Sequence, residues 1–205
     1  QEFDALLDRI NAQAEDLKRL SFEDALTGLK NRRFFDEQLR LAWAMLQRTN
    51  QPLSLLILDV DDFKRYNDRY GHQQGDAALR AVAQVTRQVL RRAVDTVARY
   101  GGEEFAAILP GTSVADAQLM AERVRIEVLA LGLPHAMSQV VGVVSVTIGV
   151  ASSGARSDLE AEELLRLADE ALYAGKNSGK NRVFLAPEPC QKEVSGREER
   201  EPFGT

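Results

Sequence analysis

Residues 96–109 read Thr-Val-Ala-Arg-Tyr-Gly-Gly-Glu-Glu-Phe-Ala-Ala-Ile-Leu and place two glycines between two apolar runs. This pattern predicts a β-hairpin with Gly101 and Gly102 in its turn, because glycine adopts positive φ angles without steric cost. Glu103 and Glu104 follow directly, and strand alternation would send their side chains to opposite faces of the sheet. A bare glycine turn also lets a large ligand lie against the backbone. An ordinary hairpin with solvated glutamates explains these residues equally well.

A second acidic cluster favours the ligand-binding interpretation. Residues 53–62 read Leu-Ser-Leu-Leu-Ile-Leu-Asp-Val-Asp-Asp, an apolar run that predicts a strand buried on both faces. Asp59 falls at its carboxyl end, where a buried carboxylate is costly unless a positive group meets it. With Glu103 it would suit Mg²⁺, which takes a few carboxylates and leaves positions for phosphate oxygens. The alternative is that Asp59 and Asp61 are ordinary turn residues at a strand end.

With their neighbours, these residues resemble the GGDEF family of diguanylate cyclases, here in the variant Gly-Gly-Glu-Glu-Phe. The resemblance extends from about residue 21 to 186, and its motifs keep the family's order and spacing. They are DALTGLKNRR at 24–33, DVDDFKRYND at 59–68, YGHQQGD at 70–76 and ADEALYAGKNSGKNRV at 168–183. Within the family, the likeness is greatest to the cyclase domain of WspR-type response regulators.

The resemblance implies an enzyme that joins two GTP molecules into cyclic di-GMP and releases two pyrophosphates. Each step is an in-line attack of a ribose 3′-hydroxyl on an α-phosphate, which mainly needs positioning and charge neutralisation. It further implies two Mg²⁺ or Mn²⁺ ions per active site, a homodimer or higher oligomer, and cyclic di-GMP as both product and inhibitor. The expected setting is bacterial second-messenger signalling in the cytoplasm.

The resemblance also assigns roles residue by residue. The implied metal ligands are Asp59, Glu103 and the carbonyl of Val60, and the implied catalytic residues are Glu103 and Glu104. The implied substrate-binding residues are Asn67 and Asp76 for guanine, and Phe63, Lys64, Lys176 and Lys180 for phosphate.

Each substrate-binding residue also has an ordinary structural explanation. Asn67 suits a turn, Asp76 suits the N-cap of a helix over 76–91, and Phe63 suits the core at a helix start. The lysines, without the family, would simply be solvated. Many relatives have arginine where Lys180 stands, and lysine keeps the charge but loses bidentate geometry.

A product-inhibition site is implied by Arg92 and Asp95, an Arg-x-x-Asp pair six residues before Gly101. Arginine suits phosphate and guanine faces, and aspartate suits the guanine edge. Arg123 falls where relatives supply an arginine from a neighbouring subunit or helix. Taken without the family, such a pair is usually an ordinary surface ion pair.

Composition limits the function classes. The 205 residues correspond to one domain with appendages, and the net charge of −5 argues against a nucleic-acid binder. The single cysteine, Cys190, allows no internal disulfide. No apolar run approaches the ~20 residues of a membrane span, and no signal peptide is recognisable.

The two ends of the chain differ from the middle. An apolar seam at heptad spacing predicts an N-terminal coiled-coil stalk helix over residues 1–20, on which a regulatory protein or upstream sensor would act. An amphipathic helix folded back on the domain is the alternative. Residues 187–205 are rich in charge, Pro and Gly and are predicted to be a disordered tail. The seam consists of Phe3, Leu6, Ile10, Gln13, Leu17 and Leu20.

Between the ends, residues 21–186 predict one catalytic domain of the α+β class. Strand and helix patterns give a β-α-β-β-α-β order, as in a ferredoxin-like palm, in agreement with the nucleotidyl-cyclase-like fold that the resemblance implies. We expect a central mixed, mainly antiparallel sheet flanked by helices. The predicted strands are 53–60, 95–100, 104–109, 143–151 and 182–185, and the predicted helices are 31–49, 76–91, 113–131 and 159–175, with 63–74 helical and then looped.

Two rival functions remain at this point. One is a non-catalytic receptor that binds cyclic di-GMP through Arg92 and Asp95. The other is an interaction module whose N-terminal helix recruits a partner. Because the chain keeps Asp59 and both glutamates of the Gly-Gly-Glu-Glu-Phe motif, the sequence favours the enzyme.

Overall fold

The computed structural model describes residues 22–154 and 160–187. The predicted stalk over 1–20 and nearly all of the predicted tail over 187–205 lie outside the described residues. Within them, a single six-stranded sheet has the order β1-β3-β4-β2-β5-β6. The strands are β1 (Lys30–Asn31), β2 (Leu53–Val60), β3 (Thr96–Gly101), β4 (Glu104–Pro110), β5 (Val146–Ser152) and β6 (Val183–Leu185).

The four central strands form an antiparallel ferredoxin-like palm. β2 pairs with β4 on one side and β5 on the other, and β3 pairs with β4, all antiparallel. β1 and β6 add parallel edges to β3 and β5. The expected mixed, mainly antiparallel sheet is therefore confirmed.

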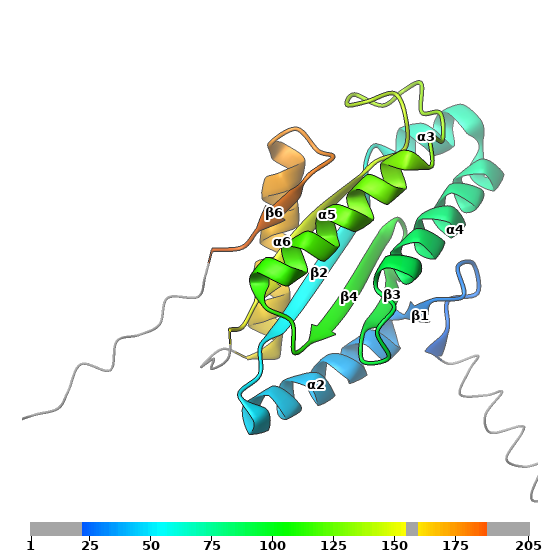
Figure 1. Cartoon of the computed structure of the whole chain (residues 1–205). Helices are drawn as coiled ribbons and strands as arrows, with labels where there is room; N and C mark the ends of the chain where they lie inside the picture. The colour runs from blue at the N-terminus through cyan, green and yellow to red at the C-terminus, as the bar shows by residue number, and fades with distance from the viewer. Residues whose placement is uncertain (1–21, 155–159, 188–205) are drawn as a thin grey trace, which may run out of the picture.

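Helices cover both faces of the sheet (Figure 1). Helices α4 and α5 lie on one face with α3 at their end, and α2 and α6 lie on the other. No helix in the described ranges is long and apolar enough to cross a membrane. The helices are α2 (Arg32–Thr49), α3 (Phe63–Tyr70), α4 (His72–Val89), α5 (Val114–Ala130) and α6 (Ala161–Asn177).

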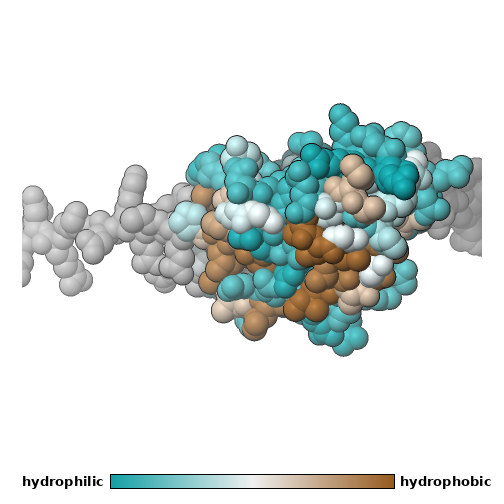
Figure 2. All heavy atoms as spheres, turned by 90° about the horizontal axis from the view of Figure 1, so that it is seen from above, coloured by the Kyte–Doolittle hydropathy of each residue, from teal (hydrophilic) through white to brown (hydrophobic). Residues whose placement is uncertain are grey.

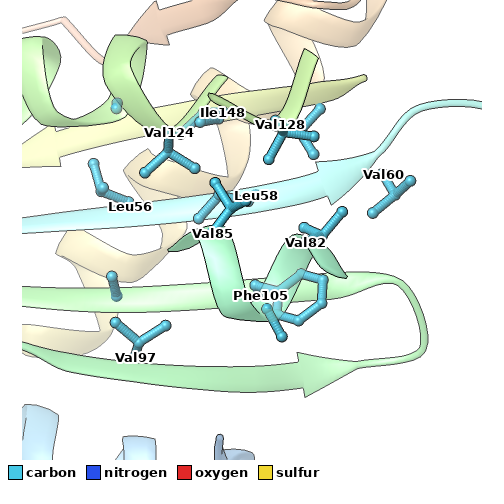
Figure 3. Close-up of a cluster of buried hydrophobic side chains, with 14 of the residues drawn as sticks. Leu56, Leu58, Val60, Val82, Val85, Val97, Phe105, Val124, Val128 and Ile148 are labelled. Atoms are coloured by element: carbon cyan, nitrogen blue, oxygen red, sulfur yellow. The ribbon is translucent and has the colours of Figure 1, made fainter. Parts of the chain in front are cut away.

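Strand β2 separates two hydrophobic cores, and all eight of its residues are buried. Alternation sends Leu56, Leu58 and Val60 toward α4 and α5, where they meet valines of both helices and Phe105 of β4 (Figure 3). Leu55 and Ile57 point to the opposite core under α2 and α6. The apolar run around 53–60 is thus a doubly covered strand, and Asp59 enters the second face.

The sequence misplaces the start of α4. The helix begins at His72 rather than at 76, directly after Gly71, whose φ of 81° ends α3. Gly75 and Asp76 therefore lie inside α4, and Asp76 is not its N-cap. Gly75 is needed for close packing, since a Cβ there would lie 1.8 Å from Oδ1 of Asn67. Gly75 is therefore a point of tight contact between α3 and α4 and not a helix boundary.

Smaller differences occur elsewhere. β5 begins at Val146 rather than 143, because Val143 forms an isolated bridge with Pro134. Helix α6 spans Ala161–Asn177, so it begins and ends two residues later than the predicted 159–175. Ser113 caps α5, because its hydroxyl accepts a hydrogen bond from the Asp116 N–H.

Candidate active site

The end of β2 and the glycine turn bring four predicted site residues together. Asp59 lies opposite Glu104 in the β2–β4 register. The Val60 N–H donates to the carbonyl of Glu103 at 3.3 Å. Glu103 itself lies in the turn and not in a strand, so the alternation argument applies only to Glu104. Both glutamates are partly exposed and can meet a ligand.

Asp59 is the electrostatic centre of this group. Asp59 is buried, with 8% of its surface exposed, and its Oδ2 lies 2.8 Å from the Nζ of Lys176 on α6. Burial raises the pKa of Asp59 to about 6; the ammonium of Lys176 opposes this shift, and the charges of Glu103 and Glu104 reinforce it. The site therefore holds more negative charge than one lysine neutralises.

This donor set fits a hard divalent cation. Two carboxylates and the Val60 carbonyl are oxygen ligands of the kind that Mg²⁺ prefers. The described part of the chain has no group of three or more His, Cys, Asp or Glu side chains that could hold a metal alone. Backbone, water or phosphate oxygens would therefore have to complete the coordination, as expected of a site that binds metal together with a phosphorylated substrate.

The two aspartates after Asp59 have structural partners. Asp61 is 2% exposed and accepts hydrogen bonds from Ser145 Oγ at 2.6 Å, Thr147 Oγ1 at 2.5 Å and the Asn181 N–H at 3.0 Å. It anchors the segment after α6 to the sheet. The ordinary structural explanation that the sequence left open thus fits Asp61 better than Asp59.

Lys180 reaches the same region through Asp62. Its Nζ lies 2.6 Å from Asp62 Oδ1, and the Gln139 N–H donates to Oδ2 at 3.2 Å. Burial alone would raise the pKa of Asp62, but these two hydrogen bonds lower it below its usual value. The predicted phosphate-facing Lys176 and Lys180 are thus both held by carboxylates at the site, and an incoming phosphate would compete for them.

The predicted guanine residues lie on neighbouring helices, Asn67 on α3 and Asp76 on α4. Among the described residues, Asn67 Oδ1 is a buried acceptor with no hydrogen-bond partner. A ligand donor could satisfy it. Phe63 is buried and stacks on Tyr66, so only its backbone can face a ligand, whereas Lys64 is exposed in the first turn of α3.

The sequence missed a brace on the glycine turn. Arg99 donates from Nε and Nη2 to the carbonyl of Gly102 at 2.9 and 2.7 Å, and from Nη1 to Asp24 at 3.2 Å. Asp24 also accepts from the backbone N–H and the hydroxyl of Thr27. Residues at the start of the domain are therefore tied to the turn that carries Glu103. The available signal was the 24–33 motif, to which the sequence assigns no functional role.

The predicted product site is joined only in part. Arg92 forks onto Asp95, whose side chain is fully buried, with Nη2 2.5 Å from Oδ1. Hydrogen bonding to Asp95 raises the pKa of Arg92 above its usual value. Both residues line a cavity of about 950 Å³ beside α2, together with Arg87 and Arg91. Arg123 is exposed on α5 and does not line this cavity.

The surface around the site is mixed in character. Figure 2 looks onto the end of the molecule at which α3 lies, and it shows hydrophilic surface beside a hydrophobic area. The α5–β5 loop, which donates the Gln139 N–H to Asp62, carries exposed apolar side chains at Met137 and Val141. One rim of the site is therefore partly apolar.

A palm sheet with a buried aspartate and paired glutamates at one strand end describes a candidate metal and nucleotide site. The chain belongs to the GGDEF family, since the family model described as "Diguanylate cyclase, GGDEF domain" matches residues 21–182. The family and fold that the sequence predicted are thus confirmed. The particular likeness to WspR-type cyclases stays a prediction.

Curated relatives agree with the family. Response regulator PleD from Caulobacter vibrioides is 41% identical over 165 residues, which cover 80% of this chain and 36% of PleD. Diguanylate cyclase DgcS from Shewanella oneidensis is 37% identical over 190 residues, 91% of this chain and 61% of DgcS. The chain thus spans less than two thirds of the length of either relative.

Solved structures share the fold. The coiled coil and GGDEF domain of DgcB from Caulobacter crescentus, in complex with c-di-GMP, matches with a TM-score of 0.82 and 34% identity over 90% of this chain and 96% of that one. Diguanylate cyclase SiaD from Pseudomonas aeruginosa, in complex with its activator SiaC, gives 0.73 and 34%, over 90% and 71%. The active GGEEF domain of a Vibrio cholerae diguanylate cyclase gives 0.68 and 32%, over 78% and 98%.

Proposed function

We propose that this chain is a diguanylate cyclase that condenses two GTP molecules into cyclic di-GMP. The observation that carries the proposal is the meeting of Asp59, Glu103 and Glu104 at one strand end, with Lys176 and Lys180 beside them. The Vibrio cholerae domain described as active has the same GGEEF variant. A non-catalytic receptor would not need this charged arrangement.

In each step, the 3′-oxygen of one GTP bonds to the α-phosphorus of the other, and the bond to the departing pyrophosphate breaks. The hydroxyl proton passes to Glu103 or to water. Two Mg²⁺ or Mn²⁺ ions, held by Asp59, Glu103 and the Val60 carbonyl, would stabilise charge on the attacking and leaving oxygens. Glu104 supports this group from the facing position on β4.

The remaining predicted residues bind the nucleotide. Lys176 and Lys180 exchange their carboxylate partners for phosphate oxygens, and the N-terminus of α3 at Phe63 and Lys64 offers backbone N–H groups to the same charge. Asn67 and Asp76 read the base. Guanine presents N1–H and N2–H₂ donors together, which a carboxylate can accept.

The test is incubation of the full chain with GTP and Mg²⁺, followed by chromatography of the products. We expect cyclic di-GMP and pyrophosphate. Glu103→Gln, which keeps the shape and removes the charge, should lower turnover at least about 100-fold. Glu127→Gln, at an exposed position on α5, is the matched control. No cyclic product from the unmodified chain, or normal turnover by Glu103→Gln, would contradict the proposal.

The cavity at Arg92 and Asp95 is proposed as the inhibitory product site. Arg92→Lys keeps a charge beside the buried Asp95 carboxylate but loses the bidentate fork, so it should weaken inhibition without unfolding the loop. Progress curves with added cyclic di-GMP should then show inhibition only at several-fold higher product concentration, with initial rates close to those of the unmodified chain. If cyclic di-GMP inhibited both proteins equally, Arg92 and Asp95 would be an ordinary surface ion pair and not a product site.

Catalysis is proposed to require two domains, because one domain holds one GTP and the product contains two. A homodimer, or a higher oligomer, would satisfy this requirement, and the two-fold product suits a two-fold arrangement. A regulatory protein or upstream sensor acting on residues 1–20 is supported by the complex of SiaD with its activator. We place the reaction in bacterial second-messenger signalling in the cytoplasm.

A further inference from the structure

A second cavity opens beside the catalytic carboxylates. Its volume is about 310 Å³, at the lower end of the range of ligand pockets, and it lies between α6 and strands β2, β3 and β4. Glu104 lines it directly. Ile57, on its floor, is two residues before Asp59 and shares the same face of β2. The cavity therefore adjoins the reacting group without containing any residue that the sequence assigned to the bound GTP.

The lining of this cavity selects for hydrogen-bond donors. Its carboxylates are Glu104, Glu162 and Asp169. In the described ranges, no hydrogen bond or ion pair involves the side chain of Glu162 or Asp169. Its one cation, Arg166, is already bound by Glu163 and Glu170 on α6. A phosphate would be repelled here, whereas a hydroxyl group would be accepted.

The other walls suit the carbon face of a sugar. Ile57 and Leu165 are apolar, and Tyr100 adds an aromatic ring. That ring is held edge-on by Phe35 at 5.3 Å between centroids, with the Arg32 guanidinium 4.5 Å above it. The wall is therefore positioned before any ligand arrives.

We infer that this cavity is the acceptor subsite, which receives the ribose of the GTP carried by a second copy of the chain. The inference rests on the proposed cyclase function. The second nucleotide keeps its guanine and triphosphate in its own domain, so its ribose edge is what must approach the first domain. The 3′-hydroxyl then faces Glu103 and Glu104, and the 2′-hydroxyl donates to Asp169. A carboxylate is a favourable acceptor for a ribose hydroxyl.

The test compares GTP with 2′-deoxy-GTP as sole substrate for the full chain. The unmodified enzyme should prefer GTP by about tenfold or more in kcat/KM, the usual effect of a hydrogen bond to a charged group. Asp169→Ala should lose most of this preference, because the enzyme and substrate changes remove the same contact. Asp169→Asn keeps one acceptor oxygen, so its preference for GTP should lie between those of the unmodified enzyme and Asp169→Ala. Glu127→Ala should keep the full preference.

The outcomes separate this inference from the proposed function. If the unmodified chain makes no cyclic product from GTP, the cyclase proposal itself fails. If it does, but Asp169→Ala discriminates between the two substrates as the unmodified enzyme does, the subsite is wrong. If Asp169→Ala keeps the preference for GTP but no longer self-associates in sedimentation, the subsite inference is also overturned. The cavity would then hold a side chain of the second copy and not its ribose. Asp169 is exposed on a helix, so alanine is compatible with folding there.

Discussion

Two aspartates at the end of β2 affect the stability of the fold in opposite directions. In the described part of the chain, Asp59 is buried beside two glutamates with one basic contact, Lys176, whereas Asp61 is buried with three hydrogen-bond donors. The first is arranged for a ligand and the second for the fold. Replacing each by asparagine separates the two roles, because the change removes charge at nearly constant shape.

Asp59→Asn should stabilise the metal-free protein at neutral pH. The pKa of Asp59 rises on folding from 3.8 to about 6, so its contribution to stability is fully present below pH 3.8 and is lost as the pH rises through about 6. At pH 7 the ionised carboxylate therefore destabilises the fold, and its removal should raise the free energy of unfolding by about 1–3 kcal/mol. Urea titrations between pH 4 and pH 8 should also lose part of their pH dependence, while cyclase activity disappears.

Asp61→Asn should do the reverse. The new amide would place an N–H₂ donor against groups that already donate, either the Ser145 hydroxyl and the Asn181 N–H or the Thr147 hydroxyl. Leaving such buried groups unsatisfied should lower the free energy of unfolding by about 1–3 kcal/mol. The same urea titrations at pH 7 measure it. If both variants shifted stability in the same direction, this division between ligand-binding and structural aspartates would be wrong.

At the scale of elements, the brace on the hairpin links the start of the domain to the site. Arg99 joins the Gly102 carbonyl to Asp24, which lies 75 residues away in the sequence. Arg99→Lys keeps the charge but cannot serve both partners with a planar fork. We expect turnover to fall about tenfold with a small loss of stability, because Glu103 is then held less firmly. Steady-state kinetics beside thermal unfolding measure both effects.

The control for this prediction is Arg40→Lys on α2, where the side chain is exposed and its Nε donates to the Asp36 carbonyl of its own helix. It should leave turnover unchanged. Normal turnover by Arg99→Lys would mean that the hairpin positions Glu103 without the brace.

The same scale shows what the sequence could and could not predict. The hairpin and β2 follow from local patterns, since two glycines and a continuous apolar run each permit few conformations. The predicted α3–α4 boundary was wrong because Gly75 packs closely against Asn67 at a contact between the two helices and does not form a turn. The 24–33 motif drew attention to Asp24, but spacing in sequence carries no information on its contact with Arg99, which is made through the folded sheet.

At the scale of the molecule, the sheet order brings distant motifs to one end. The carboxyl end of β2, the β3–β4 turn and the end of α6 are far apart in the chain, yet Asp59, Glu103 and Lys176 meet there. In the proposed cyclase, this arrangement would serve one nucleotide. Arg123 is exposed on α5 and does not line the Arg92 cavity, so its predicted role in the product site would need a contribution from a second copy.

The need for a second domain makes assembly the final prediction. The seam of residues 1–20 spans fewer than three heptads and contains Gln13, so it predicts a weak dimer whose main effect is to raise the local concentration of the second domain. Specific activity should therefore fall on dilution. When Leu6, Ile10 and Leu17 are changed to serine, this fall should begin at a higher protein concentration, because the weaker dimer dissociates earlier. Changing Asp4, Asp8 and Glu15 to serine, off the seam, is the control. Activity that stays constant down to dilutions at which sedimentation detects only monomer would show that one chain completes the reaction alone.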